Sequence, residues 1–523
     1  MYVFFADKER KTYKQMRKEV HTFAASLLAL GLVKGDRMAV WGGNHYEWLL
    51  TYYACALIGV IVVHIPLIFS AKMQLGILQT VGVKGLLLTR SPSHIYDTVC
   101  EIIPEICATT PETFASQSIP NLKFIISCAE GDKRQRGAYS PDAVIARCTD
   151  EFRRHVDEIC PTVDSDDPFM ILFTSGSTGL PKPVTHSSHA LLNNMNEAGI
   201  YRKQFPGYEE DKVRRYALIS PLEGMNSHII ALLTVLHQCT VVACPTYDRM
   251  LAVEAITKER CTDTIMFQYM AYDILNMPDL HKYDFSSLKN IAVGGNVIPL
   301  SLRERSKQIT ENILVGYGST EVSSATLQHP MDPEDKKTSA SMYPIGGFEV
   351  KVCSDSGEVL PVGQPGEILV RCVSMFLYYW GDEERTRSAK DSNGWWHSGD
   401  IGVMDSDGFI QLLGRQSETI IKKAYSFFPF EVEKVLDEHP CISAVMVVGV
   451  PDDRTGEEVC ACIRLHPEKT VSKSELQDYC KGKVAPDLIP EYVLFMEDFP
   501  KTETGKIHRR KLAEFASERV KDQ

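Results

Sequence analysis

Short apolar segments that run into small residues recur along the chain, and they restrict its fold more than any other feature. Strands are predicted at 38–41, 170–173, 291–293 and 313–315, and each is followed by glycine, serine or threonine. Helical stretches such as 250–260 lie between them. This alternation predicts an α/β fold with mainly parallel sheets covered by helices on both faces.

Three of these strands lead into loops of small residues, at 174–182, 294–295 and 316–319. Ligands of parallel α/β sheets bind at the carboxyl ends of the strands, where such loops meet. We therefore expect the three loops to form one shared site.

The pattern changes after Arg415. Between residues 430 and 499 we expect a helix, two β-rich runs, a second helix and a last strand, which is a normal size for a small α+β domain. The sequence predicts a large N-terminal domain, residues 1–415, and a small C-terminal domain, residues 416–523.

The charge balance and the cysteines restrict the partners and the compartment. The 523 residues carry 56 Lys and Arg against 68 Asp and Glu, a net charge of −12, and they show no basic stripe with interleaved aromatics. Nucleic acid is therefore an unexpected partner. The 15 cysteines are scattered without paired spacing, which favours reduced thiols inside a cell.

Residues 48–69 contain no Asp, Glu, Lys or Arg and are long enough to cross a bilayer. Gly59 interrupts them, the β-branched run 60–63 follows, and His64 and Pro66 suit a bilayer centre poorly. We predict a buried helix followed by a buried strand and no transmembrane segment.

The loop at 174–182 is the strongest local motif. Glycines let backbone N–H groups converge on an anion, the hydroxyls add donors, and the terminal lysine supplies positive charge. A strand precedes it, and we expect a helical stretch after it. A solvated Ser/Gly loop is the alternative interpretation. The motif predicts phosphate binding by Thr174, Ser175, Gly176, Ser177, Thr178, Gly179 and Lys182.

With four further segments in order, this loop resembles the signature of the adenylate-forming superfamily, which includes acyl-CoA synthetases, firefly-type luciferases and peptide-synthetase adenylation domains. The resemblance runs from about Thr12 to Leu512, and it is greatest to the medium-chain acyl-CoA synthetases. The four segments are 316–321 (GYGSTE), 396–400 (WHSGD), 414–415 (GR) and 504–506 (TGK).

The resemblance implies a nucleotide site for ATP. Tyr317 would stack on adenine, with Gly294 and Gly295 allowing close backbone approach, while Asp400 would accept the ribose hydroxyls beside Arg415. Alternative interpretations are an ordinary core aromatic at Tyr317 and a turn cap at Asp400.

The resemblance also implies a catalytic set. Thr320 would contact phosphate, and Glu321 would help hold Mg²⁺. Lys506 would reach over from the C-terminal lid domain and stabilise the charge that develops between the acid and the α-phosphate, unless it is only a solvated charge. The implied reaction forms an acyl adenylate and then a thioester with coenzyme A.

The chain departs from the family pattern in the segments that would act in the coenzyme A step. Glu418 stands at the hinge, where Asp or Lys is usual. The next segment, 422–428, carries Lys423 and Ala424 where the family has Gly-Gly. Glycines permit unusual φ and close approach of a ligand, so we expect these two residues to restrict both.

The family's acyl-site segment is altered as well. Pro-Leu is usually followed by an aromatic residue and a histidine, but Glu223 and Gly224 follow it here. His228 lies four residues on and is considered as a substitute. Pro183 ends the phosphate loop where Gly is usual, and Ser188 stands where a histidine is common.

Three hypotheses remain open at this point. The first is an acyl-CoA synthetase for a medium-chain or related acid, which the resemblance would place in mitochondria. The second is an adenylating enzyme with weak or no transfer to coenzyme A. The third is a nucleotide- or acyl-binding protein without turnover. Neither the acid nor the oligomeric state can be read from the residues.

Overall fold

The computed structural model describes residues 1–67, 69–92, 94–128, 136–174, 181–206, 214–294, 300–423, 425–452, 454–501 and 507–521. Part of the predicted site lies outside the described residues. It comprises Ser175, Gly176, Ser177, Thr178, Gly179, Gly295 and Lys506.

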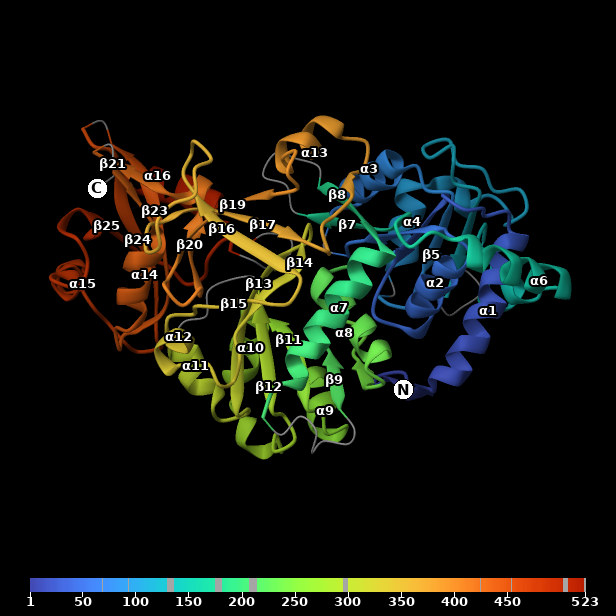
Figure 1. The fold of residues 1–523 in the computed structure, drawn as a ribbon, viewed down its shortest axis with the longest axis horizontal. Helices are drawn as coiled ribbons and strands as arrows, with labels where there is room; N and C mark the ends of the chain where they lie inside the picture. Colours follow the sequence, from blue (N-terminus) through green and yellow to red (C-terminus); the bar gives the residue numbers. More distant parts are fainter. Residues whose placement is uncertain are drawn as a thin grey trace.

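Two large sheets form the N-terminal part of the chain, and their inner strands are parallel (Figure 1). The first sheet has the order β15 (Tyr343–Pro344), β14 (Ser323–Leu327), β13 (Asn312–Ser319), β12 (Asn290–Gly294), β11 (Asp263–Phe267), β9 (Arg215–Leu218), β10 (Thr240–Ala243), β1 (Tyr2–Phe4) and β2 (Glu9–Lys11). The second has the order β18 (Tyr378–Tyr379), β8 (Lys182–Ser187), β7 (Pro168–Thr174), β4 (Ile61–Ile65), β3 (Arg37–Trp41), β5 (Gly85–Leu88) and β6 (Phe124–Ser127).

Helices cover both faces of both sheets. One core is shared by the two sheets and contains α1 (Tyr13–Ala29), α2 (Tyr46–Leu57), α7 (Ser188–Lys203) and α8 (Met225–Leu236). The outer face of the first sheet packs on α9 (Arg249–Lys258), α10 (Gln268–Leu275) and α11 (Leu300–Ser306). The outer face of the second packs on α3 (Ala71–Val81) and α4 (Ile95–Ile102). Covered, mainly parallel sheets are therefore confirmed.

The apolar stretch 48–69 divides as predicted. α2 ends at Leu57, β4 begins at Ile61, and Gly59 lies between them with φ +66°. α2 is buried in the core that the two sheets share. The apolar residues of β4 alternate between that core and the core under α3 and α4. In the part of the chain that the structure describes, no helix is long and apolar enough to cross a membrane.

The first helix, α1, begins with a cap at Thr12. The Thr12 side chain accepts a hydrogen bond from the backbone of Gln15, whose side chain in turn accepts from the backbone of Thr12. This reciprocal cap satisfies two N–H groups that the first turn of a helix leaves free.

The predicted continuation of the phosphate loop is wrong. The loop joins β7 to β8, which pair antiparallel, with Thr174 opposite Lys182. The helix α7 begins only at Ser188. A strand, and not the helix, therefore directly follows the loop at Lys182.

A third, antiparallel sheet leads to the C-terminal part. Its order is β16 (Phe348–Cys353), β17 (Gly366–Cys372), β19 (Trp396–Met404) and β20 (Ile410–Arg415). The remaining helices of this larger part are α5 (Pro141–Ile145), α6 (Asp150–Ile159), α12 (Glu334–Thr338), α13 (Glu383–Ala389) and the 3₁₀ turns η1 (Pro104–Cys107), η3 (Cys160–Thr162), η4 (Leu280–Lys282) and η5 (Gln416–Glu418).

The C-terminal residues form a fourth sheet with its own core, at the opposite end of the molecule from α1 (Figure 1). Its strands are β21 (Ile420–Lys422), β22 (Tyr425–Phe427), β23 (Ile442–Asp452), β24 (Gly456–Leu465) and β25 (Tyr492–Phe495). The helices α14 (Pro429–Asp437), α15 (Lys473–Cys480) and α16 (Arg509–Val520) and the turn η6 (Pro486–Leu488) complete it. The predicted order of helix, two strands, helix and strand is present between 430 and 499.

Candidate functional site

The strand β13 brings most of the described site residues together. It lies between β12 and β14 and ends at Ser319, directly before Thr320 and Glu321. Gly318 is required where β13 turns, because a Cβ there would lie 1.9 Å from the carbonyl oxygen of Ser323. The strand can therefore approach β14 closely, directly before Thr320 and Glu321.

Tyr317, Asp400 and Arg415 form one connected group. The Tyr317 hydroxyl donates to Asp400 Oδ2 at 2.8 Å, and Arg415 Nε lies 2.8 Å from Asp400 Oδ1. Burial, with the nearby Asp400 charge, raises the pKa of Tyr317 well above its usual value, so its hydroxyl stays a donor. A carboxylate accepts several hydrogen bonds at once, so Asp400 can hold Tyr317 and Arg415 together.

The backbone sets this group in place. Asp400 on β19 pairs with Arg415 on β20, and Arg415 Nη1 donates to the carbonyl of Ser398 at 2.9 Å. The Ser398 hydroxyl in turn accepts from the Asp400 backbone at 2.9 Å. Sequence segments that looked separate, 396–400 and 414–415, are thus one antiparallel ladder.

A second group surrounds Glu321. Tyr379 donates to Glu321 Oε1 at 2.9 Å, and the ammonium of Lys182 lies 5.6 Å from the centre of the Tyr379 ring. Glu321 is buried, and the carbonyl of the same residue accepts from the Phe376 backbone at 2.8 Å. Lys182 and Glu321 therefore approach one tyrosine, which places a cation and a carboxylate in the same neighbourhood.

The sequence interpretation missed Tyr379 and also His186, which holds the Thr320 segment. His186 is fully buried on β8, and its Nε2 lies 2.7 Å from the carbonyl oxygen of Thr320. Burial lowers the pKa of His186 to about 4, so the ring is neutral and donates this hydrogen bond from Nε2. No alternation along β8 singles out His186, because Pro183 to Ser187 are all buried.

Two further histidines follow His186 in the sequence. His189 is exposed and pairs with Asp166 at 2.7 Å. His228 faces the core, where its ring lies 4.7 Å from His64 and 5.2 Å from Trp48. Burial lowers the pKa of His228 to about 3, and the nearby His186 acts in the same direction. The role of His228 as a substitute for the histidine that Gly224 replaces stays a prediction.

The expected restriction at Lys423 is wrong in one respect. Lys423 adopts φ +52°, the left-handed conformation that glycine favours, at the turn between β21 and β22. Its backbone donates to Thr455 at 2.7 Å and its ammonium pairs with Asp487 at 2.6 Å. The turn therefore has the unusual backbone without the glycine, while Ala424 lies outside the described residues.

The hinge residue is anchored to the last helix. Glu418 Oε2 lies 3.2 Å from Arg509 Nε, and Arg509 also binds Glu433 at 2.7 Å. Burial raises the pKa of Glu418, although Arg509 acts in the opposite direction. Glu418 thus keeps the carboxylate of a usual hinge and links it to the helix that follows Lys506.

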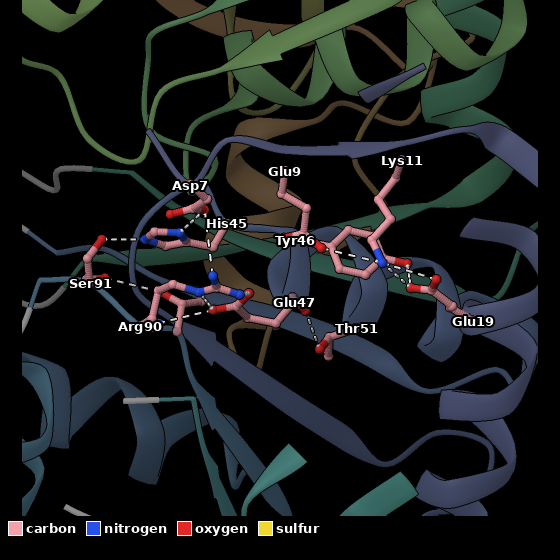
Figure 2. A network of polar contacts seen from close by, with 11 residues as sticks. Asp7, Glu9, Lys11, Glu19, His45, Tyr46, Glu47, Thr51, Arg90 and Ser91 are labelled. Carbon is pink, nitrogen blue, oxygen red and sulfur yellow. Dashed lines mark hydrogen bonds and ion pairs between the residues drawn. The ribbon is translucent and has the colours of Figure 1, made fainter. Parts of the chain in front are cut away.

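A separate polar network braces the N-terminal hairpin against α2 and the loop after β5 (Figure 2). His45 lies 2.8 Å from Asp7 and 2.5 Å from the Ser91 hydroxyl. This is the connectivity of a hydrolytic triad, but His45 is buried, and a Cβ on Gly43 would lie 3.0 Å from Ser91 Oγ. The crowding indicates a structural brace.

Known proteins are similar to this chain over nearly all of its length. The sequence model described as "AMP-binding enzyme" matches residues 1–380, and the model described as "AMP-binding enzyme C-terminal domain" matches residues 431–506. Medium-chain acyl-CoA ligase ACSF2, mitochondrial, of Homo sapiens is 33% identical over 97% of this chain and 83% of its own length. The putative acyl-CoA synthetase YngI of Bacillus subtilis is 30% identical over 97% of this chain and 92% of its own.

Solved structures agree on the fold. The amide bond synthetase McbA from Marinactinospora thermotolerans superposes with a TM-score of 0.83 at 25% identity, over 98% of this chain and 96% of its own. The family match, the full-length relatives and the shared fold together confirm the expected superfamily. The chain belongs to the AMP-binding, adenylate-forming enzymes, as a member of the AMP-forming acyl-CoA ligase family.

Proposed function

We propose that the protein joins a medium-chain or related carboxylic acid to coenzyme A in two steps. The carboxylate oxygen attacks the α-phosphorus of ATP, and pyrophosphate leaves as the acyl adenylate forms. The coenzyme A thiol, losing its proton, then attacks the acyl carbon, and AMP leaves with the bonding electron pair. Adenylation is needed because a carboxylate has no good leaving group.

The Tyr317–Asp400–Arg415 group is the observation that carries this proposal. A buried tyrosine beside a carboxylate suits an adenine ring and the two ribose hydroxyls, because the ring can stack and a carboxylate is a strong acceptor. Gly294 supports the same role, since a Cβ there would meet only Gly316 at 3.6 Å and Asn226 at 3.8 Å. The nucleotide would therefore lie across the ends of β12 and β13.

The group around Glu321 would receive the phosphates. Lys182 supplies positive charge and Thr320 a hydroxyl, together with the loop donors from Thr174 onward. Among the described residues no cluster of three His, Cys, Asp or Glu could hold a metal ion, which fits Mg²⁺ held by one carboxylate and the substrate phosphates. Bound there, Mg²⁺ would neutralise phosphate charge, with Glu321 as its protein ligand.

The two parts of the chain would divide the work. We assign the nucleotide and the acid to residues 1–415, and the lid with the catalytic Lys506 to residues 416–523. Between the two steps the lid would rotate about Glu418. This rotation would remove Lys506 from the reacting groups and bring the β21–β22 turn to them. The mitochondrial relatives suggest a mitochondrial location for this protein, which subcellular fractionation tests.

A pyrophosphate-release screen over fatty and aromatic acids, run with and without coenzyme A, tests the proposal. We expect acid-dependent pyrophosphate release and coenzyme A-dependent AMP formation. The Lys506→Ala variant should lose most of this activity. Its matched control is Lys501→Ala, which removes a nearby lysine of the same lid segment and should keep the activity. The proposal is wrong if no acid gives AMP with coenzyme A.

Transfer to another acceptor is the second candidate. Lys423 occupies the turn where the family pattern has glycine, and its side chain is half-exposed and tied to Asp487. Acid-dependent pyrophosphate exchange without thioester, followed by adenylate consumption when an amine is added, would favour this candidate. ATP binding in calorimetry with no exchange for any acid would favour a binding protein without turnover.

A further inference from the structure

A rigid turn carries Glu223 to the junction of the two large sheets. The turn follows β9 and caps α8, with the Gly224 backbone donating to Pro221 at 3.1 Å. Asn44 holds it from both sides, because its amide donates to Ser220 at 2.8 Å and its carbonyl accepts from Leu222 at 2.7 Å. The backbone that presents Glu223 is therefore fixed.

The bracing network continues this support. Asn44 directly precedes His45, whose ring is held between Asp7 and Ser91 (Figure 2). The Asn44 backbone also donates to Pro245 at 2.7 Å. A side chain on such a support has a defined position, which is what recognition of a substrate group requires.

Glu223 has little compensation within the protein. Its carboxylate accepts a long hydrogen bond, 3.4 Å, from the backbone of Leu67, just after β4, and a second from its own backbone N–H. In the ranges that the structure describes, no lysine, arginine or histidine forms an ion pair with it. Tyr269 of α10 is near enough that, after burial and Asp273, the Glu223 charge also raises the pKa of its hydroxyl. A half-buried carboxylate without a cationic partner is costly, so its position needs a reason.

The surroundings of Glu223 leave room for a ligand. Glu223 is only partly buried, and partial burial raises its pKa to about 7. A Cβ on Gly224 would meet only the Pro221 carbonyl, at 3.5 Å, so there is room beside the turn. The Asn226 amide nitrogen would lie 3.8 Å from a Cβ on Gly294, so the start of α8 adjoins the end of β12.

We propose that Glu223 selects acids whose chain carries a hydrogen-bond donor, above all an ammonium group, over plain alkyl acids. The inference rests on the proposed function and names its substrate class. An ammonium would supply the charge partner that Glu223 lacks, and a hydroxyl would supply a donor. A second carboxylate on the substrate would be repelled.

The test compares acids of four to eight carbons as ω-amino, ω-hydroxy, unsubstituted and ω-carboxy forms, in pyrophosphate exchange. A hydrogen bond to a charged group contributes about 1.5–3 kcal/mol, so we expect kcat/KM roughly 10- to 100-fold higher for the best ω-amino acid than for its alkyl counterpart. Glu223→Leu should reverse this order. Glu223→Gln should lose the amino preference and keep the hydroxy preference.

The matched control is Asp273→Asn on α10, a nearby carboxylate already bonded to Tyr247 at 3.4 Å, which should keep the wild-type order. An alkyl preference in the wild type, unchanged by Glu223→Leu, would overturn the inference. If no acid supports exchange, the proposed function fails by itself. Calorimetry then decides the inference: binding of the ω-amino acid that Glu223→Leu abolishes supports it, and absence of binding overturns it.

Discussion

Replacement of Lys423 tests whether the β21–β22 turn stores backbone strain. At φ +52° the left-handed conformation costs a residue with a Cβ about 1–2 kcal/mol, whereas glycine pays about 0.5–1 kcal/mol of extra chain entropy. Lys423→Gly should therefore be more stable than Lys423→Ala by about 1 kcal/mol. Both variants lose the half-exposed pair with Asp487, worth at most about 1 kcal/mol, so their difference isolates the backbone.

Hydrogen exchange of residues 420–427 is the suitable assay, because the Lys423 amide donates to Thr455 at 2.7 Å and exchanges only when the turn opens. A difference of 1 kcal/mol corresponds to about fivefold slower exchange in the glycine variant. Lys434 is the matched control, since it is exposed in the interior of α14. There glycine should be less stable than alanine by about 1 kcal/mol. Equal exchange in the two Lys423 variants would refute the assigned strain.

Three further predictions concern the site. Asp400→Asn removes the ion pair with Arg415 and should raise the KM for ATP about 10-fold or more. The KM for the acid should stay nearly unchanged, and equal effects on both KM values would contradict a role of Asp400 at the ribose. Lys506→Ala should lower pyrophosphate exchange about 10²- to 10³-fold with ATP binding retained in calorimetry, and unchanged exchange would remove Lys506 from catalysis. Folding raises the pKa of Glu223 from 4.5 to about 7. Between these pH values the folded protein holds a proton that the unfolded chain has released. The free energy of unfolding therefore falls as pH rises from 4.5 to 7, by up to about 3 kcal/mol. Urea unfolding followed by tryptophan fluorescence should show this fall in the wild type and not in Glu223→Gln, and parallel pH profiles would contradict it.

Local chemistry made much of the fold predictable. The break at Gly59 depends on a few neighbouring residues, and it is confirmed. The continuation after Lys182 was wrong because the strand β8 comes between the loop and the helix α7. The pairing of β8 with β7, which makes this segment a strand, is a tertiary contact that no local pattern contains.

The site was predictable only where a motif reports a chemical role. Asp400 and Glu321 belong to such motifs, and the structure gives each a tyrosine partner. Tyr379 and His186 belong to none, since they act by holding Glu321 and Thr320 from other strands. Supporting residues of this kind come from distant segments, so their role appears only when the sheets are assembled.

The departures from the family pattern are distributed unevenly, and the packing explains why. Tyr317, Asp400 and Arg415 bind one another, so a change in one removes a partner from the others. At Gly224 a Cβ would meet only one atom, at 3.5 Å, and at Lys423 the side chain is half-exposed. Changes at these two positions therefore leave the Tyr317–Asp400–Arg415 group undisturbed. This geometry favours an enzyme that keeps the adenylation chemistry and has altered what it activates, which is the outcome that the Glu223 and Lys423 variants measure separately.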